Sequence, residues 1–169
     1  MYRSFFALIS MLVPCSIMAV EAGAAGLPEG AMPFEENKEI ILDGVKTIVG
    51  KASGYRLVVG DKTVLVGPWK AASLDGTPLF SGLYDNAGRK TGLWTQYQEA
   101  GKVFIVGNFL DGVAHGPVIS YHKNGSLAGI LWNEKGTQDG ISVTLSPEGK
   151  IIEVEKRKDR KVTETLKAE

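Results

Sequence analysis

Few residues of this chain have the types and spacing that a catalytic or metal site requires. The sequence contains two histidines, His115 and His122, and a single cysteine, Cys15. A zinc site needs three or four converging ligands, and nucleophilic catalysis needs a base beside the nucleophile. His115 could pair with Asp111, and His122 with a facing carboxylate, but neither combination supplies a full ligand set, and both are typical of ordinary surface groups. We therefore predict no catalytic residues, no metal site and no enzymatic activity, with a histidine-dependent hydrolase as the least favoured alternative.

Composition also excludes several partner classes. The sequence contains no glycine-rich phosphate loop of either common pattern, so we expect no nucleotide cofactor and no other cofactor. Positive and negative side chains balance, with 19 Lys and Arg against 19 Asp and Glu. Nucleic-acid binding needs a basic surface that displaces counterions, so we expect no nucleic-acid partner.

Large aromatic side chains are the remaining candidates for a binding site. Some recur at similar places in the chain, and the candidate binding residues are Trp69, Trp94, Tyr97, Tyr121 and Trp132. If equivalent rings lie in neighbouring hairpins, they form a ladder along a sheet. Such a ladder is either core packing and cross-strand pairing or an exposed stripe that binds a sugar polymer or an extended peptide.

Glycine recurs in the second half of the chain with a fixed step of 24 residues. Three columns keep this step, namely Gly88, Gly112 and Gly136; Gly92, Gly116 and Gly140; and Gly101, Gly125 and Gly149. A fixed period of this length predicts a stack of similar units. A fourth and more divergent copy begins at Gly67, so the predicted copies span residues 67–91, 92–115, 116–139 and 140–155.

Each copy predicts one β-hairpin. The second glycine of each copy closes a turn, with Asn124-Gly125 as the strongest signal, and the leading glycine opens the hairpin. Positions one, three and five after the leading glycine, such as Leu93, Thr95 and Tyr97, form an apolar-leaning face. We expect this face to be buried throughout. The other face, which starts at Trp94, becomes more polar toward the C-terminus.

The combination of glycine, Trp94, Tyr97 and the Asn124-Gly125 turn resembles the bacterial variant of the MORN repeat, as found in the YwqK antitoxin-like family. The resemblance covers about Gly67 to Val154, although Val118, Ser142 and Leu145 replace expected aromatic residues. It implies an all-β fold in which stacked antiparallel β-hairpin repeats form one elongated, twisted sheet. It also implies an antitoxin or immunity-type function that neutralises a toxin.

The segments beside the repeats have their own patterns. Residues 39–66 predict two β-hairpins, with turns at Asp43-Gly44 and Gly60-Asp61, which either cap the stack or extend its sheet. Residues 25–38 are rich in glycine, proline and acidic side chains, which predicts a linker. Residues 156–169 begin with a basic cluster and predict a charged C-terminal tail, which is either solvated or in contact with an anionic lipid or polymer.

The first residues are typical of a secretory signal peptide. Arg3 precedes the apolar run from Phe5 to Val13, and small residues continue to Ala24. We predict a signal peptide over residues 1–24 and export to the periplasm or the cell surface. An uncleaved membrane anchor and a lipid anchor through Cys15 are less favoured. After signal cleavage we expect no membrane span.

These observations favour a non-catalytic exported repeat module that binds a protein or a cell-envelope polymer through a face of its β-sheet. The alternative is the antitoxin or immunity-type function, of which only an exported form agrees with the signal peptide. Lys156 to Lys161 place charge beside the last predicted strand, where it opposes pairing with another chain. We therefore expect a monomer or a weak dimer.

Overall fold

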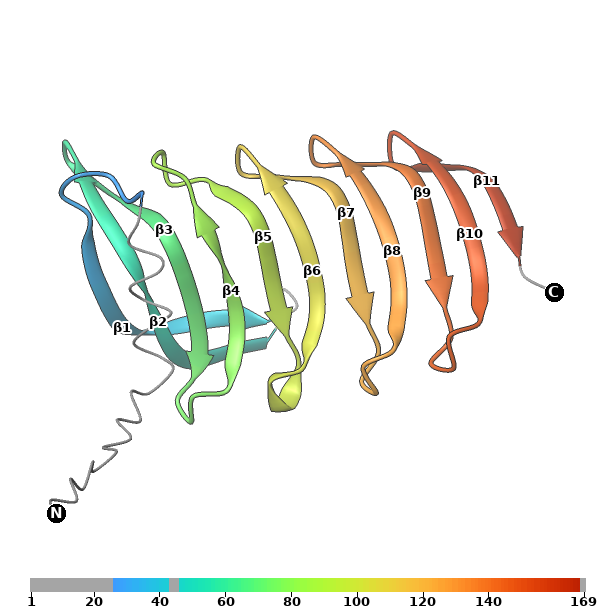
Figure 1. Cartoon of the computed structure of the whole chain (residues 1–169), viewed down its shortest axis with the longest axis horizontal. Coiled ribbons are helices and arrows are strands. Elements are labelled where there is room, and N and C mark those ends of the chain that lie inside the picture. The colour runs from blue at the N-terminus through green and yellow to red at the C-terminus, as the bar shows by residue number, and fades with distance from the viewer. Residues whose placement is uncertain (1–25, 43–45, 168–169) are drawn as a thin grey trace, which may run out of the picture.

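A computed structural model describes residues 26–42 and 46–167, and these form one open antiparallel sheet of eleven strands (Figure 1). The predicted signal peptide lies outside these residues. The strands are β1 (Met32–Leu42), β2 (Lys46–Val59), β3 (Lys62–Ser73), β4 (Pro78–Tyr84), β5 (Lys90–Tyr97), β6 (Val103–Leu110), β7 (Val113–Tyr121), β8 (Leu127–Glu134), β9 (Thr137–Leu145), β10 (Ile151–Lys158) and β11 (Lys161–Lys167).

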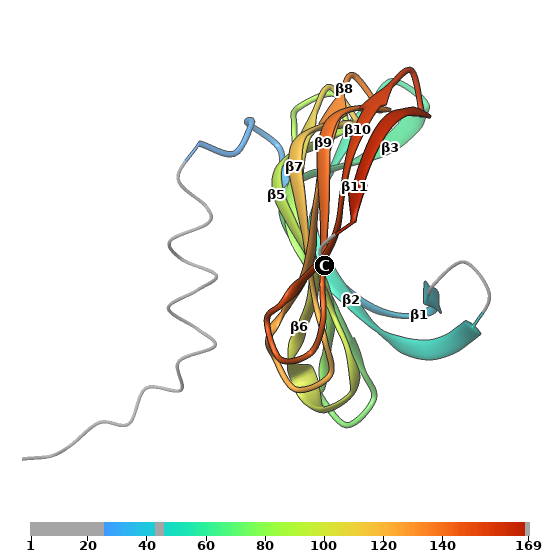
Figure 2. The ribbon, with the colours of Figure 1, turned by 90° about the vertical axis from the view of Figure 1, so that its right-hand side faces the viewer.

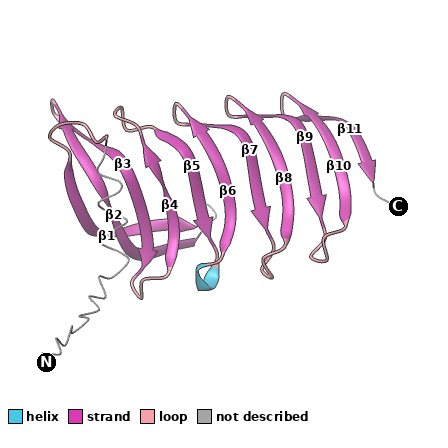
Figure 3. Ribbon diagram, in the orientation of Figure 1, coloured by secondary structure: helices cyan, strands magenta, loops and turns pink. Residues whose placement is uncertain are grey.

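Every strand pairs with the next one along the chain, so the sheet consists of consecutive hairpins. The prediction of stacked antiparallel hairpins in one elongated sheet is confirmed. Within the described residues, one short 3-10 turn, Glu99–Gly101, separates β5 from β6 (Figure 3). Within residues 26–42 and 46–167, no helix is long and apolar enough to span a membrane.

The second glycine of each copy closes a turn, as predicted. The amide of Gly125 donates to the carbonyl of His122 at 2.9 Å, and the amide of Gly149 donates to Ser146 at 2.9 Å. Both glycines have positive φ, which a glycine adopts at little cost. These turns line one long side of the sheet, which is the lower side in Figure 1.

The leading glycines do not open hairpins, which corrects the prediction. Gly92 lies inside β5, where Ser81 pairs with Thr95 but Leu83 pairs with Thr91, so β5 contains two more residues than β4 across this interval. The same irregularity surrounds Gly116 in β7 and Gly140 in β9. Their φ angles are 62°, 86° and 120° respectively. Each leading glycine is therefore a β-bulge residue, and a bulge bends its strand and increases the local twist.

The linker predicted over residues 25–38 is wrong from Met32 onward, because β1 begins there and pairs with β2 along its whole length. The first predicted hairpin is otherwise found, with Ile40 opposite Ile48, although its turn is outside the described residues. The second predicted hairpin, around Gly60-Asp61, joins β2 to β3. The N-terminal hairpins therefore extend the sheet.

The charged tail predicted over residues 156–169 is also wrong. Strand β10 continues to Lys158, and β11 pairs with it over Lys161–Lys167. These strands lack the alternation of apolar and polar residues that identifies a strand in a sequence. An edge strand that is exposed on both faces can consist of charged side chains instead.

The buried core is confined to the N-terminal half of the sheet. Ile40, Ala71 and Leu79 form its centre, and Ile48, Trp69 and Phe80 pack against them. The core lies there because the β1–β2 hairpin curves out of the plane of the other strands, toward one face of the sheet (Figure 2). Among the described residues, the buried hydrophobic side chains all lie in β1 to β5. From β6 onward, the described residues form a single layer.

Candidate binding surfaces

The two faces of the sheet differ, and the face that carries Trp69 and Trp94 is called the aromatic face below. Trp69 pairs with Gly82 in register, and a Cβ placed on Gly82 would lie 2.2 Å from the ring of Trp94. The two indole rings stack, with centroids 5.7 Å apart, while Tyr84 and Phe109 meet Trp94 edge-on at 5.0 and 6.2 Å. These four side chains form one aromatic cluster.

The aromatic cluster is packing within the sheet. Trp94 is only 7% exposed, and its indole N–H donates to the carbonyl of Leu83 at 3.0 Å. The ammonium of Lys90 lies 4.3 Å from the centre of the Trp94 ring, which favours a cation–π interaction. Burial lowers the pKa of Lys90 from its ordinary value. Trp94 has no free ring face, so it does not belong to an exposed binding ladder.

A groove of about 980 Å³ runs along the turn side of the aromatic face, across β4 to β8. Equivalent positions of successive hairpins line it, one repeat step apart. Two sets contain three equivalent residues each: Ser73, Gln98 and His122 at the turns, and Leu79, Phe104 and Ala128 at the start of the return strands. Two further sets contain two equivalent residues each: Gln96 and Ser120, and Tyr97 and Tyr121.

The pairing register assigns the groove to the aromatic face. Phe80 pairs with Ala71 on one side and with Gln96 on the other, and Trp69 lies two residues from Ala71 on the same face. Ile48, which comes from β2, packs against the same core and also borders the groove. The curved β1–β2 hairpin therefore forms one wall of the groove.

Hydrogen bonds join the turns that border the groove. The side-chain amide of Gln98 donates to the carbonyl of His122 at 3.3 Å. Nε2 of His122 lies 2.9 Å from the carbonyl oxygen of Leu145 in the next hairpin. Asn124 donates to the carbonyl of Pro147 at 3.0 Å. These contacts fix the spacing of successive hairpins and give the groove a regular edge.

One carboxylate at the end of the groove is held in its charged form. The hydroxyl of Ser73 donates to Asp75 at short range, and the backbone amide of Thr77 donates to the same carboxylate at 3.0 Å. These hydrogen bonds lower the pKa of Asp75 from 3.8 to about 2. The turn between β3 and β4 therefore presents a negative charge over the ordinary pH range.

The face opposite the aromatic one carries a continuous aliphatic row in its C-terminal half. Residues that pair directly across neighbouring strands form this row, and they are Val106, Ile119, Ile130, Val143, Val154 and Leu166. Leu93, Trp132 and Ile141 flank the row on the same face and are 64%, 47% and 60% exposed. The prediction that this face is buried throughout is therefore wrong, because no second layer covers it among residues 26–42 and 46–167.

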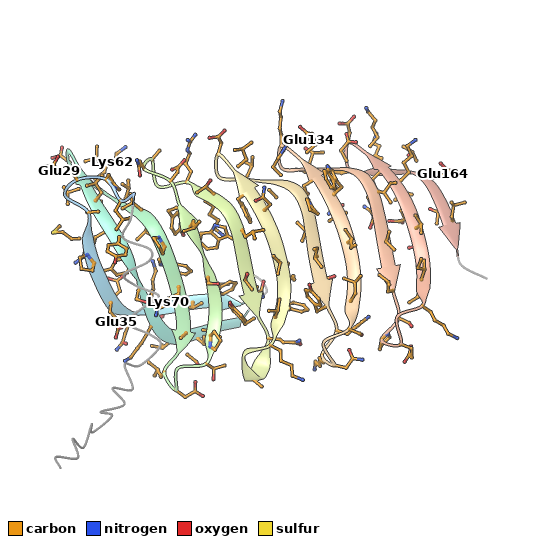
Figure 4. The ribbon with its side chains drawn as sticks, viewed as in Figure 1. Glu29, Glu35, Lys62, Lys70, Glu134 and Glu164 are labelled. Atoms are coloured by element: carbon orange, nitrogen blue, oxygen red, sulfur yellow. The ribbon has the colours of Figure 1, made fainter. Side chains whose placement is uncertain are left out.

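The same transverse row continues to the other end of the sheet with polar residues. Thr95 of β5 pairs with Val106 and continues the row. From β4 to β1 the row then contains Ser81, Lys70, Ser53 and Glu35, and each of these residues pairs with the next one across neighbouring strands. This polar part borders a second cavity of about 650 Å³ at β1 to β4. Figure 4 labels Glu35 and Lys70, which lie there on β1 and β3.

The five aromatic residues predicted from sequence divide among three places. Trp69 and Trp94 join in the aromatic cluster, Tyr97 and Tyr121 both border the groove, and Trp132 lies on the aliphatic face. Sequence reasoning missed Gln96 and Ser120 in the groove. These two residues are also 24 positions apart, like the glycines. A comparison of polar residues at equivalent positions of the repeat could therefore have found them.

Metal chemistry has no support within the described part of the chain, where no group of three His, Cys, Asp or Glu side chains converges. His115 lies 3.9 Å from Glu134, without a third ligand-type partner. Comparison with models of known protein families, with curated proteins and with solved structures finds no match.

Proposed function

We propose that this protein is a non-catalytic, exported binding module that holds a protein or a cell-envelope polymer along its sheet. The observation that carries the proposal is the groove, because equivalent residues of three successive hairpins line it. Successive hairpins lie about 10 Å apart, since each contains two strands with a spacing of about 4.8 Å. A regular row of similar positions fits an extended, repetitive ligand better than a compact small molecule.

The chemistry of the groove agrees with a ligand rich in hydroxyl and amide groups. Gln96, Gln98 and Ser120 line the groove with neutral amide and hydroxyl groups, and Phe104 adds apolar surface. Asp75, Lys102 and Lys123 contribute charges of both signs to the groove. Export is proposed from the pattern of residues 1–24. Membership among MORN-like repeats is proposed from the glycine and aromatic pattern of the hairpins.

The test is to fill the groove with one bulky side chain. Ser120→Tyr places a ring inside the groove, and we expect the purified variant to lose retention on immobilised cell-envelope material. Thr144→Tyr is the matched control, because Thr144 occupies the equivalent position one repeat later, outside the groove. It should bind as the unmodified protein does.

Hydroxyl-radical footprinting with the same envelope material locates the contact. Protection of Phe104, which lines the groove, supports the proposal. Equal binding by both tyrosine variants, or absence of protection anywhere on the sheet, contradicts it.

A further inference from the structure

Within the described part of the chain, no second layer covers the aliphatic face of β5 to β11, although a sheet face of this composition requires one. Its central row runs from Val106 to Leu166 through six strands and contains no charged residue. Stable domains bury such a face against a helix or another sheet. Exposed apolar patches of this size on a soluble chain mark an interaction surface.

The shape of this face indicates what covers it. Both cavities lie elsewhere, one along the turn side of the aromatic face and one at β1 to β4. The aliphatic face between Leu93 and Leu166 is a broad, continuous sheet surface that neither of these cavities enters. Such a surface packs best against another sheet face, at the distance of about 10 Å that is typical of β-sandwiches.

We infer that the partner is a second copy of this chain, so that two aliphatic faces pack into a symmetric β-sandwich. A twofold axis through the middle of the row, near Ile130 and Val143, places aliphatic residues of one copy against those of the other. The row offers no charge that would repel its own copy. Lys156 and Glu164, which flank the row on β10 and β11, pair with each other in register and balance locally.

The available area agrees with a stable dimer. Strands β5 to β11 are seven strands of about eight residues, and their face measures roughly 900 Å² from the usual spacings of about 4.8 and 3.4 Å. A standard protein interface buries about 800 Å² on each partner. The face is thus large enough to form a dimer without a contribution from β1 to β4.

This dimer leaves the proposed ligand groove open. The groove lies on the aromatic face, which points outward from the sandwich in both copies. Two grooves on opposite sides allow one assembly to hold two segments of a polymer, which raises the apparent affinity without new contacts. The dimer itself does not depend on the proposed function, because it uses the other face.

Sedimentation equilibrium of the purified protein and its variants tests this inference. We expect the unmodified protein to form a dimer. The double variant Leu93→Lys, Ile141→Lys should raise the dimer dissociation constant by about a hundredfold or more, because its interface would bury unpaired charges. Both sites are largely exposed in a single copy, so the variant should keep its β-sheet circular dichroism. Val58→Lys changes an exposed residue of β2 outside the face and should leave the dimer intact.

A second measurement uses the unmodified protein alone. Trp132 is exposed on the aliphatic face, whereas Trp94 is buried and Trp69 lies in the aromatic cluster. Acrylamide quenching of tryptophan fluorescence should therefore fall as the protein concentration rises through the dimerisation range.

Four results overturn the inference. They are a monomer at all concentrations, a double variant that dimerises as tightly as Val58→Lys does, quenching that does not change with concentration, and a monomer whose aliphatic face captures a protein of different sequence. Ser120→Tyr should still dimerise, so failure of the dimer and failure of the groove are distinguishable.

Discussion

The indole rings of Trp69 and Trp94 stack with centroids 5.7 Å apart, although β3 and β5 are separated by β4. Gly82 of β4 makes this contact possible. It pairs with Trp69 in register and lies under the ring of Trp94, with no side chain between them. Rings that lie over glycine cover its backbone and help to fix the register of a sheet.

Gly82→Ala should therefore disrupt the aromatic cluster. The added methyl group would lie 2.2 Å from the Trp94 ring, so one of the rings must move. We expect a loss of about 2 to 4 kcal/mol in the free energy of unfolding, as for other overpacked cores. Urea unfolding and near-ultraviolet circular dichroism measure the two effects.

Gly107→Ala is the control for this substitution. Gly107 pairs with Trp94 from the other side, but its added Cβ would come no closer than 3.3 Å to a methyl group of Val118 and 3.8 Å to the ring of Phe109. A loss of stability as large as that of Gly82→Ala would show that the stack is not the cause.

The bulge glycines should differ in their tolerance of a side chain. At Gly116 a new Cβ would meet nothing within 4 Å, so Gly116→Ala costs only the positive φ of 86°. At Gly140 the new Cβ would also lie 3.0 Å from Cβ of Trp132. We expect a loss of about 1 to 2 kcal/mol for Gly116→Ala and a larger loss for Gly140→Ala, measured by thermal and urea unfolding.

Trp132→Gly separates the two contributions at Gly140, because it also removes Cβ of Trp132. In that background, Gly140→Ala should cost about as much as Gly116→Ala, because only the backbone strain remains. An unchanged difference between the two glycines would refute the steric explanation.

The fold was more predictable than the surfaces, and these glycines show why. A 24-residue period in three columns is sufficient for a stack of hairpins, because turns need glycine at fixed places. The period does not distinguish a turn glycine from a bulge glycine, since both need positive φ. The period alone therefore predicts that Gly92 opens a hairpin, whereas Gly92 lies in a bulge inside β5.

Burial was harder to predict because it depends on a distant segment. Alternation identifies Leu93 and Ile141 as one apolar face, but only a second layer buries such a face. The covering hairpin, β1–β2, lies instead against the aromatic face near Ala71 and Leu79. Nothing in the local pattern of a strand determines which of its faces another segment will cover.

Arg160 occupies a place where glycine is expected. It follows Gly88, Gly112 and Gly136 by the same 24-residue step, and its φ is 66°. Arg160→Gly should relieve this strain while keeping the hydrogen bond from its amide to the carbonyl of Gln138, which is 3.0 Å long. We expect stabilisation by about 0.5 to 1 kcal/mol in urea unfolding, since a non-glycine residue with positive φ costs about 1 to 2 kcal/mol and glycine adds entropy to the unfolded chain. Arg160→Ala removes the charge but not the strain, so stabilisation by alanine would contradict this explanation.

Asp75 should make the stability of the protein depend on pH in a narrow acidic range. Hydrogen bonds from Ser73 and Thr77 lower its pKa in the folded state to about 2, below the 3.8 that is usual for the unfolded chain. A depressed pKa means that the folded state favours the charged carboxylate. The stabilisation is therefore complete above about pH 5 and is lost as the pH falls toward 2.

The difference in unfolding free energy between the unmodified protein and Asp75→Asn measures this contribution. The difference should be constant from neutral pH down to about pH 5 and should shrink between about pH 4 and pH 2. Ser73→Ala removes the first of the hydrogen bonds and should raise the pKa of Asp75 toward 3.8 in an NMR titration. A difference that stays constant down to pH 2, or a pKa that Ser73→Ala leaves unchanged, would exclude the turn hydrogen bonds as the cause.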